Sequence, residues 1–239
     1  MIVRWVTGFL DTPSRDAEPF WLAVTGTSLS ARRGPDGRFA TLVPAAGDAF
    51  LRVQVVGDPP ARAHLDLHVD DVAAAARVVT GLGAALTHSE EDLAVLRSPA
   101  GIVFCLVPWH GERELPRAVR WEGPQSSLVD QLALDIPAPA YPREVMFWAA
   151  VTGWERKASD LPEFSFLQAS ARMPLRLLLQ RVGSASAGVH LDLACDDVDA
   201  EVRRHLGLGA TVVRRVPGDW TTLRDPAGRE YCVTARSPF

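Results

Sequence analysis

The chain repeats itself, and this repeat constrains its fold more than any other feature. Residues 64–86 read HLDLHVDDVAAAARVVTGLGAAL and residues 190–212 read HLDLACDDVDAEVRRHLGLGATV, with 13 identities in 23 aligned positions. Two shorter segments recur at nearly the same offset: FWLAVTG at 20–26 returns as FWAAVTG at 147–153, and LRSPAGIVFCLV at 96–107 returns as LRDPAGREYCVT at 223–234. A repeat that covers most of each half predicts that both halves adopt the same fold.

Each half predicts the order strand, helix and three strands, written twice. In HLDLHV the apolar Leu65 and Leu67 alternate with polar residues, which is typical of a strand with one buried face. Asp70 or Asp71 is the expected N-cap of the helix that follows. An earlier helix is predicted from about Pro13 to Gly26. The sequence therefore predicts four βαβββ modules, two in each half, with His64 and Asp66 on the concave face opposite the helix.

The composition excludes several classes of function. Among 239 residues, 47% are hydrophobic, which is enough for one large domain or two small ones, and the net charge of −4 disfavours a nucleic-acid partner. No apolar run approaches the roughly 20 residues of a membrane helix, so no membrane partner is expected. The three cysteines form no disulfide-like pattern, and with no recognisable signal peptide they indicate a cytoplasmic protein.

The motifs FWLAVTG, HLDLHVDDV and SPAGIVFCL, each of which recurs in the second half with substitutions, resemble the vicinal oxygen chelate superfamily. Their residues are most similar to its actinobacterial glyoxalase-like subgroup. That superfamily contains glyoxalase I, extradiol dioxygenases and bleomycin-resistance proteins. The resemblance implies an α+β fold of tandem duplicated glyoxalase-like domains, each built from two paired βαβββ modules that form a cupped mixed-sheet barrel. The expected domains are 1–110 and 127–239, joined by a linker at 111–126. The chain is expected to be a monomer with an internal pseudo-dimer, or a homodimer.

The resemblance also implies where metal ligands would stand, because in that family they come from the first and last strands of the modules. Carried onto this sequence, the positions are Gln54, His64 and Cys105 in the first half, and Gln180, His190 and Cys232 in the second. The remaining first-strand positions fall near Val6 and Ala133, which cannot bind a metal. Cysteine stands where the family has glutamate. This thin donor set makes no cofactor the first expectation, and a divalent metal (zinc, nickel, manganese or iron) the alternative.

Each candidate residue also has a purely structural interpretation. His64 and His190 are metal ligands, catalytic bases assisted by Asp66 and Asp192, or buried histidines satisfied by a neighbouring strand. Cys105 and Cys232 are thiolate ligands, nucleophiles or small buried hydrophobes. The remaining candidates for ligand binding in the cup are Gln54, Gln180, Arg52, His68 and Trp220.

Two functions of different class follow. The first is a binding protein that sequesters or carries a small molecule in a cupped barrel without a full metal site. The alternative is a metal-dependent lyase, isomerase or dioxygenase that acts on a small oxygenated substrate. In both cases the partner is a small molecule.

Overall fold

The computed structural model describes residues 1–169 and 172–238, and the predicted module order is present in the first half. The elements are β1 (Trp5–Thr12), α1 (Glu18–Thr25), β2 (Ser28–Leu29), the 3-10 helix η1 (Pro35–Gly37), β3 (Phe39–Val43), β4 (Leu51–Val55), β5 (Arg62–Val69), α2 (Val72–Gly81), β6 (Ala85–Glu90), β7 (Leu93–Arg97) and β8 (Val103–Pro108).

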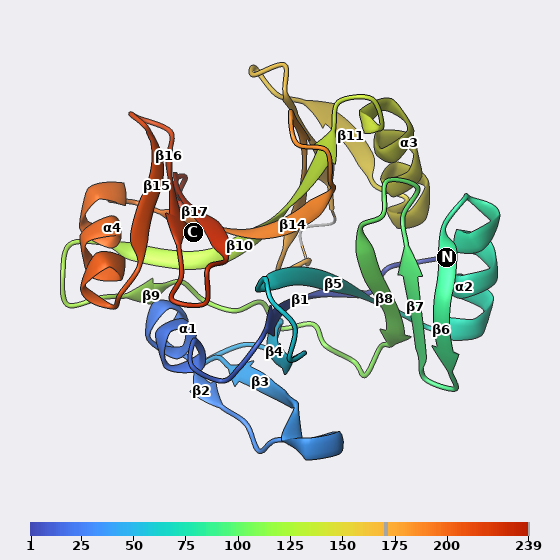
Figure 1. The fold of residues 1–239 in the computed structure, drawn as a ribbon, viewed down its shortest axis with the longest axis horizontal. Coiled ribbons are helices and arrows are strands. Elements are labelled where there is room, and N and C mark those ends of the chain that lie inside the picture. Colours follow the sequence, from blue (N-terminus) through green and yellow to red (C-terminus); the bar gives the residue numbers. More distant parts are fainter. Residues whose placement is uncertain (170–171, 239) are drawn as a thin grey trace. The chain divides into compact units, whose positions relative to one another are not determined.

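The second half repeats this order after one short extra strand. Its elements are β9 (Val119–Arg120), β10 (Ser126–Pro137), α3 (Tyr141–Thr152), β11 (Glu155–Ala158), β12 (Phe164–Gln168), β13 (Arg176–Val182), β14 (Gly188–Cys195), α4 (Val198–Gly207), β15 (Thr211–Val216), β16 (Trp220–Arg224) and β17 (Glu230–Ala235). The prediction of four βαβββ modules and an α+β fold is confirmed (Figure 1). The extra strand β9 lies inside the predicted linker and pairs with β10.

The two sheets follow the two halves of the sequence. One has the strand order β2-β3-β4-β1-β5-β8-β7-β6 and the other β11-β12-β13-β10-β14-β17-β16-β15. In each sheet the first and last strands of one module are parallel neighbours, β5 with β8 and β14 with β17. Parallel neighbours require a crossover, which α2 and α4 begin in their respective modules.

The compact units of the structure are not contiguous in sequence. Unit 1 comprises residues 1–8, 64–113 and 132–189, and unit 2 comprises residues 9–63, 114–131 and 190–239. Each unit thus combines segments of both predicted domains, and the boundaries at 110 and 127 stay a prediction. None of the helices in residues 1–169 and 172–238 is long and apolar enough to span a membrane.

The repeated HLDL motif forms the strand that the alternation predicts. Leu65 and Leu67 in β5 are fully buried. Of the two predicted N-cap residues, Asp71 is the cap, since its side chain accepts a hydrogen bond from the backbone N–H of Ala74 (2.8 Å). Asp197 caps α4 in the same way, by accepting from the N–H of Ala200 (2.9 Å).

The first helix is shorter than predicted, because it begins at Glu18 and not near Pro13. Pro19 follows directly, and proline is well tolerated in the first helical turn, where its missing N–H has no partner to lose. The predicted end is correct: Gly26 adopts φ +63° and its N–H donates to the carbonyl of Leu22.

The buried tryptophans of α1 and α3 each meet a β-turn through a carboxylate, which comes from a different position in each unit. In unit 2, Asp225 in the turn before β17 accepts hydrogen bonds from the N–H groups of Ala227 and Arg229 and from Nε1 of Trp21. In unit 1 the equivalent turn residue is Ser98, whose Oγ accepts only from the N–H of Ile102.

The missing carboxylate in unit 1 is supplied by helix α3. Glu144 accepts hydrogen bonds from the N–H of Ala100 (2.6 Å) and from Nε1 of Trp148 (2.8 Å). Trp148 in turn packs against Phe104, with ring centroids 5.0 Å apart. Ser98 and Glu144 together therefore accept the counterparts of three hydrogen bonds that Asp225 accepts alone, from two backbone N–H groups and one tryptophan.

A second buried carboxylate, Glu201, fixes α4 within unit 2. It accepts hydrogen bonds from Oγ of Ser127 (2.6 Å) and from the guanidinium of Arg204 (2.6 and 2.9 Å), and it lies 3.1 Å from Nε2 of His205. Arg204 also donates to the carbonyls of Ala23 and Val24 in the last turn of α1. Glu201 thus joins α4, α1 and the start of β10.

We expect Glu144→Ala to lower the free energy of unfolding by about 2–4 kcal/mol, because it leaves the buried Nε1 of Trp148 and the half-buried N–H of Ala100 without an acceptor. Adding Ser98→Asp should restore more than half of this loss, since it recreates the arrangement of Asp225. Urea unfolding of the single and double variants measures both effects. A double variant that is less stable than Glu144→Ala alone would contradict the equivalence of the two arrangements.

The stability that Glu201 contributes should depend on pH. Burial by itself would raise its pKa, but hydrogen bonds from Arg204 and His205 outweigh burial and lower the pKa from 4.5 to about 2. The folded protein then binds this proton more weakly than the unfolded chain, so the stabilisation is present above about pH 4.5 and is lost as the pH falls toward 2.

We therefore expect Glu201→Gln to cost about 3 kcal/mol at pH 7 and to flatten the decline of stability between pH 4.5 and 2. Urea unfolding over this pH range measures both effects. Glu230→Gln is the matched control, because Glu230 pairs with Arg224 at the surface, where such pairs contribute little. An unchanged slope in Glu201→Gln would show that other groups cause the acid sensitivity.

Candidate functional site

Three residue types of metal-binding chemistry meet on one face of unit 1. The alternation of β5 places His64 and Asp66 on the same face, two residues apart, and both are buried. Strand β8 runs parallel beside it, and Cys105 stands directly opposite Asp66 in the register. We call these three residues the His64 cluster.

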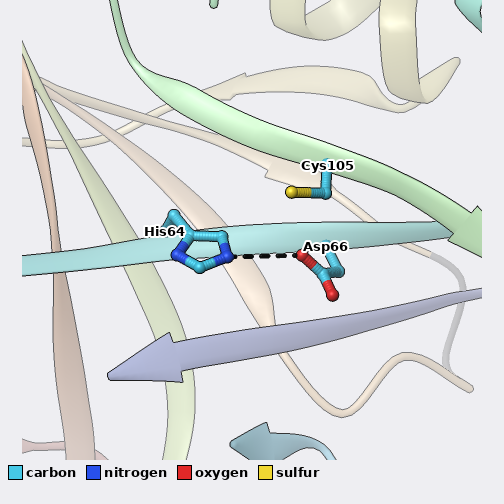
Figure 2. Close-up of side chains that lie close together, drawn as sticks. All are labelled: His64, Asp66 and Cys105. Carbon is cyan, nitrogen blue, oxygen red and sulfur yellow. Dashed lines mark ion pairs between the residues drawn. The ribbon is translucent and has the colours of Figure 1, made fainter. Parts of the chain in front are cut away.

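The donor atoms of the His64 cluster point toward one another. Nε2 of His64 lies 3.5 Å from Oδ1 of Asp66, and one donor atom from each of the three residues lies within 4.8 Å of the others. Figure 2 shows the imidazole facing the carboxylate from the same strand, with the thiol approaching from the neighbouring strand. The cluster thus presents nitrogen, oxygen and sulfur from one sheet face.

The second half builds the same arrangement in unit 2. Nε2 of His190 lies 3.3 Å from Oδ1 of Asp192, and Cys232 stands opposite Asp192 in the register of β14 and β17. These three donor atoms also lie within 4.8 Å of one another, and we call the set the His190 cluster. Because the register repeats residue for residue, the two clusters are equivalent products of the duplication.

The cysteines of both clusters are protected thiols. Burial raises the pKa of Cys105 to about 11, despite an opposing hydrogen bond from His64. Burial also raises the pKa of Cys232. All three cysteines are free, and the third, Cys195, belongs to neither cluster. The thiols of Cys105 and Cys232 are therefore protonated at neutral pH in the absence of a metal ion, and neither resembles an activated nucleophile.

Residues that the sequence did not single out position the His190 cluster. The side-chain amide of Gln131 donates to Oδ2 of Asp192, and Arg236 donates to Oε1 of Gln131 (3.3 Å). Arg236 is itself held by two hydrogen bonds of 2.7 Å to Asp130. The hydrogen bond to Oδ2 therefore holds the carboxylate of Asp192 in an orientation in which Oδ1 faces His190.

Gln131 lies close to the first-strand position that the sequence predicts in the second half. The sequence places that position near Ala133, and near Val6 in the first half; both residues are fully buried and apolar. Gln131 lies two residues before Ala133 and contacts Asp192, and Thr7 lies one residue after Val6 and contacts His68. The placement of the two first-strand positions stays a prediction.

The two clusters differ in what surrounds them. In unit 1, His68 follows on the same face of β5, with its Nε2 at 2.8 Å from Oγ1 of Thr7 and its Nδ1 at 3.4 Å from Oε1 of Glu112. Glu112 comes from the segment predicted as a linker. The second half has Ala194 at the position of His68, and instead brings Oγ1 of Thr222 to 3.4 Å from Sγ of Cys232.

The remaining predicted residues come from other strands. Gln54 and Gln180 occupy equivalent places on β4 and β13, opposite Phe39 and Phe164. Gln54 belongs to unit 2, which contains the His190 cluster, and Gln180 belongs to unit 1, which contains the His64 cluster. The guanidinium of Arg52 lies 5.7 Å from the ring centroid of Phe9. Trp220 lines a cavity of about 640 Å³ at the start of α4, whose lining contains none of the three residues of the His190 cluster. A binding role for these four residues stays a prediction.

The donor chemistry of each cluster fits a divalent metal ion. Zinc is held at about 2.0–2.3 Å by imidazole nitrogen, carboxylate oxygen and thiolate sulfur, so its ligand atoms lie about 3–4 Å from one another. The separations of 3.5 and 3.3 Å between the His and Asp donor atoms fall in this range. Three protein ligands on one side leave a coordination position open, as in catalytic sites.

Comparisons with known proteins agree with the duplicated fold. The family model of the glyoxalase-like domain matches twice, at residues 9–107 and 131–234. No curated protein sequence matches the chain.

Solved structures resemble the whole chain at low sequence identity. The Mn(II)-bound glyoxalase from Novosphingobium aromaticivorans aligns with a TM-score of 0.63 at 18% identity, over 98% of this chain and 81% of that one. A mutant of 4-hydroxymandelate synthase from Streptomyces coelicolor gives 0.62 at 18% identity, over 97% and 92%. The 2,2',3-trihydroxybiphenyl 1,2-dioxygenase from Sphingomonas wittichii gives 0.60 at 16% identity, over 95% and 88%. At these identities the likeness establishes the fold.

We expect the metal-free protein to resist alkylation at all three cysteines. Burial raises the pKa of Cys105 from 9.0 to about 11 and that of Cys195 to about 12, so iodoacetamide at pH 8 should react at least about 100-fold more slowly than with a free thiol. Mass spectrometry of the chelator-treated protein measures the rates. The urea-unfolded protein is the control, and rapid native labelling of Cys105 or Cys232 would contradict the protected thiols.

Proposed function

The chain belongs to the glyoxalase-like family of the vicinal oxygen chelate superfamily, and from this premise we propose that it holds a divalent metal ion in its His–Asp–Cys clusters and acts there on a small oxygenated molecule. The reaction class is that of a lyase, isomerase or dioxygenase. The observation that carries the proposal is the convergence of three metal-binding donors in each half, in the same strand register.

The roles of the residues follow from their geometry. His64 and His190 would bind through Nε2, Asp66 and Asp192 through Oδ1, and Cys105 and Cys232 through Sγ. A bound ion would polarise a carbonyl or hydroxyl oxygen of the substrate. Gln131 would hold Asp192 in its orientation through Oδ2, which is how residues behind a ligand tune metal affinity.

A metal-free binding protein is the second candidate, and one observation favours it. In each cluster the imidazole already lies 3.5 or 3.3 Å from a carboxylate oxygen, and the neighbouring thiol is a buried, protonated group. The histidine then serves as the partner of the carboxylate without an ion, and the cup would bind its ligand by shape and by hydrogen bonds. In either case, three free thiols support a reducing, cytoplasmic setting.

Metal analysis of protein purified without a metal-affinity tag tests the proposal. We expect one tightly bound ion for each cluster, and the loss of one ion in His64→Ala and in His190→Ala. Metal added to the chelated protein at 100 times its dissociation constant should stabilise the fold by about 2.7 kcal/mol for each site.

His88→Ala is the matched control, because His88 is exposed on β6 and pairs with Glu90 outside both clusters. Its metal content should equal that of the wild type. If the wild-type protein holds no stoichiometric metal, and no divalent ion stabilises it, the metal-dependent function is wrong and the metal-free binding protein takes its place.

A further inference from the structure

The cysteine sulfur in each cluster indicates which class of metal ion the cluster binds. We infer that both clusters select a thiophilic divalent cation of the zinc and cobalt type over manganese and magnesium, through direct bonds from Cys105 and Cys232. The inference rests on the proposed function, since it assumes that the clusters bind an ion, and it adds the chemical class of that ion.

The argument begins with the donor set. Each cluster offers one imidazole nitrogen, one carboxylate oxygen and one thiol sulfur within 4.8 Å of one another. Magnesium and manganese prefer carboxylate, carbonyl and water oxygens, whereas thiolate ligands favour zinc and other softer ions. One sulfur among three protein donors therefore biases each cluster against the oxygen-preferring ions.

The position of each thiol is fixed by the sheet and repeated in both halves. Cys105 pairs with Asp66, and Cys232 pairs with Asp192, across parallel strands. The residues beside the two cysteines differ between the halves, with Phe104 and Leu106 in the first and Tyr231 and Val233 in the second. The thiol has stayed in both copies while its neighbours in the strand changed.

The hydrogen bonding around Cys232 suits a thiolate. Oγ1 of Thr222 lies 3.4 Å from its Sγ, and Thr222 is the register partner of Cys232. When an ion displaces the thiol proton to solvent, this hydroxyl can donate to the sulfur and stabilise its charge. The register partner of Cys105 is Val95, whose side chain has no hydrogen-bond donor, so the His190 cluster should bind the ion more tightly than the His64 cluster.

The test uses the full-length protein, stripped with a chelator and titrated with Co²⁺. Cobalt bound to thiolate gives an intense charge-transfer absorption in the near ultraviolet, which oxygen and nitrogen ligands do not give. We expect this band to grow with Co²⁺ and to disappear on adding an equal concentration of Zn²⁺. Mn²⁺ at about 100-fold excess should leave it unchanged.

Cysteine variants assign the band to its source. Cys105→Ser and Cys232→Ser should each remove about half of the absorption, and the double variant should remove all of it. Cys195→Ser is the matched control, because Cys195 is also buried but its thiol donates to the carbonyl of Asp197 and lies in neither cluster. Its band should equal that of the wild type.

A second pair of variants tests the tuning by Thr222. Thr222→Val should weaken Co²⁺ binding at the His190 cluster by about 10-fold, as expected for the loss of a hydrogen bond behind a metal ligand. Val95→Thr should strengthen binding at the His64 cluster. Each is measured in the background that lacks the other cysteine, so that one site is titrated at a time.

The outcomes separate the two levels of the proposal. Co²⁺ that binds stoichiometrically without the charge-transfer band, or that Mn²⁺ displaces at equal concentration, would overturn the thiophilic selection and leave the proposed metal function standing. No binding of Co²⁺ or Zn²⁺ at all would overturn both. A band that persists in the double cysteine variant would place the ion at a different site and also overturn the inference.

Discussion

The parallel pairing of the first and last strands of a module is the constraint on which the site depends. A parallel neighbour cannot be reached by a tight turn, so α2 and α4 must begin a crossover, and the two intervening strands must complete it. The consequence is that His64 and Asp66, neighbours in sequence, meet Cys105 about forty positions later, at a place set by backbone hydrogen bonds. The same pairing joins Asp192 to Cys232. The cluster geometry is thus a property of the sheet, and the side chains determine only which chemistry stands there.

The sequence predicts those parts of the structure that depend on local pattern. Period-two alternation identified the faces of β5, aspartate caps marked the starts of α2 and α4, and the motif alignment placed Cys105 and Cys232 at equivalent positions. It does not predict partners chosen by tertiary distance. Gln131 reaches Asp192 and Glu112 reaches His68 across separations of 61 and 44 positions, and no local period marks such pairs. The prediction also took all metal ligands of a site from one half of the sequence, and so grouped Gln54 with His64. The compact units of the structure instead combine segments of both halves.

Duplication in this chain has preserved interactions more strictly than residues. Asp225 accepts hydrogen bonds from its own turn and from Trp21 in unit 2, whereas Ser98 and Glu144 divide these roles in unit 1. Both solutions place one carboxylate where a buried tryptophan N–H needs an acceptor, because leaving such a donor unpaired costs free energy. The position equivalent to Glu144 in the first half is Ala17. The carboxylate thus comes from the helix in one unit and from the β-turn in the other.

The clusters follow the opposite pattern, and this difference bears on function. A structural contact can exchange its residues as long as the hydrogen bonds are satisfied, as the tryptophan contacts show. The clusters keep histidine, aspartate and cysteine at all three positions in both halves, although serine, asparagine or valine would fit a buried strand with fewer charges to accommodate. The residues around the clusters differ between the halves. Thr222 and Gln131 contact the His190 cluster, and His68, with Glu112 beside it, lies next to the His64 cluster. This pattern is expected where the retained side chains contact a ligand and the residues that hydrogen-bond to them adjust how tightly each cluster binds it.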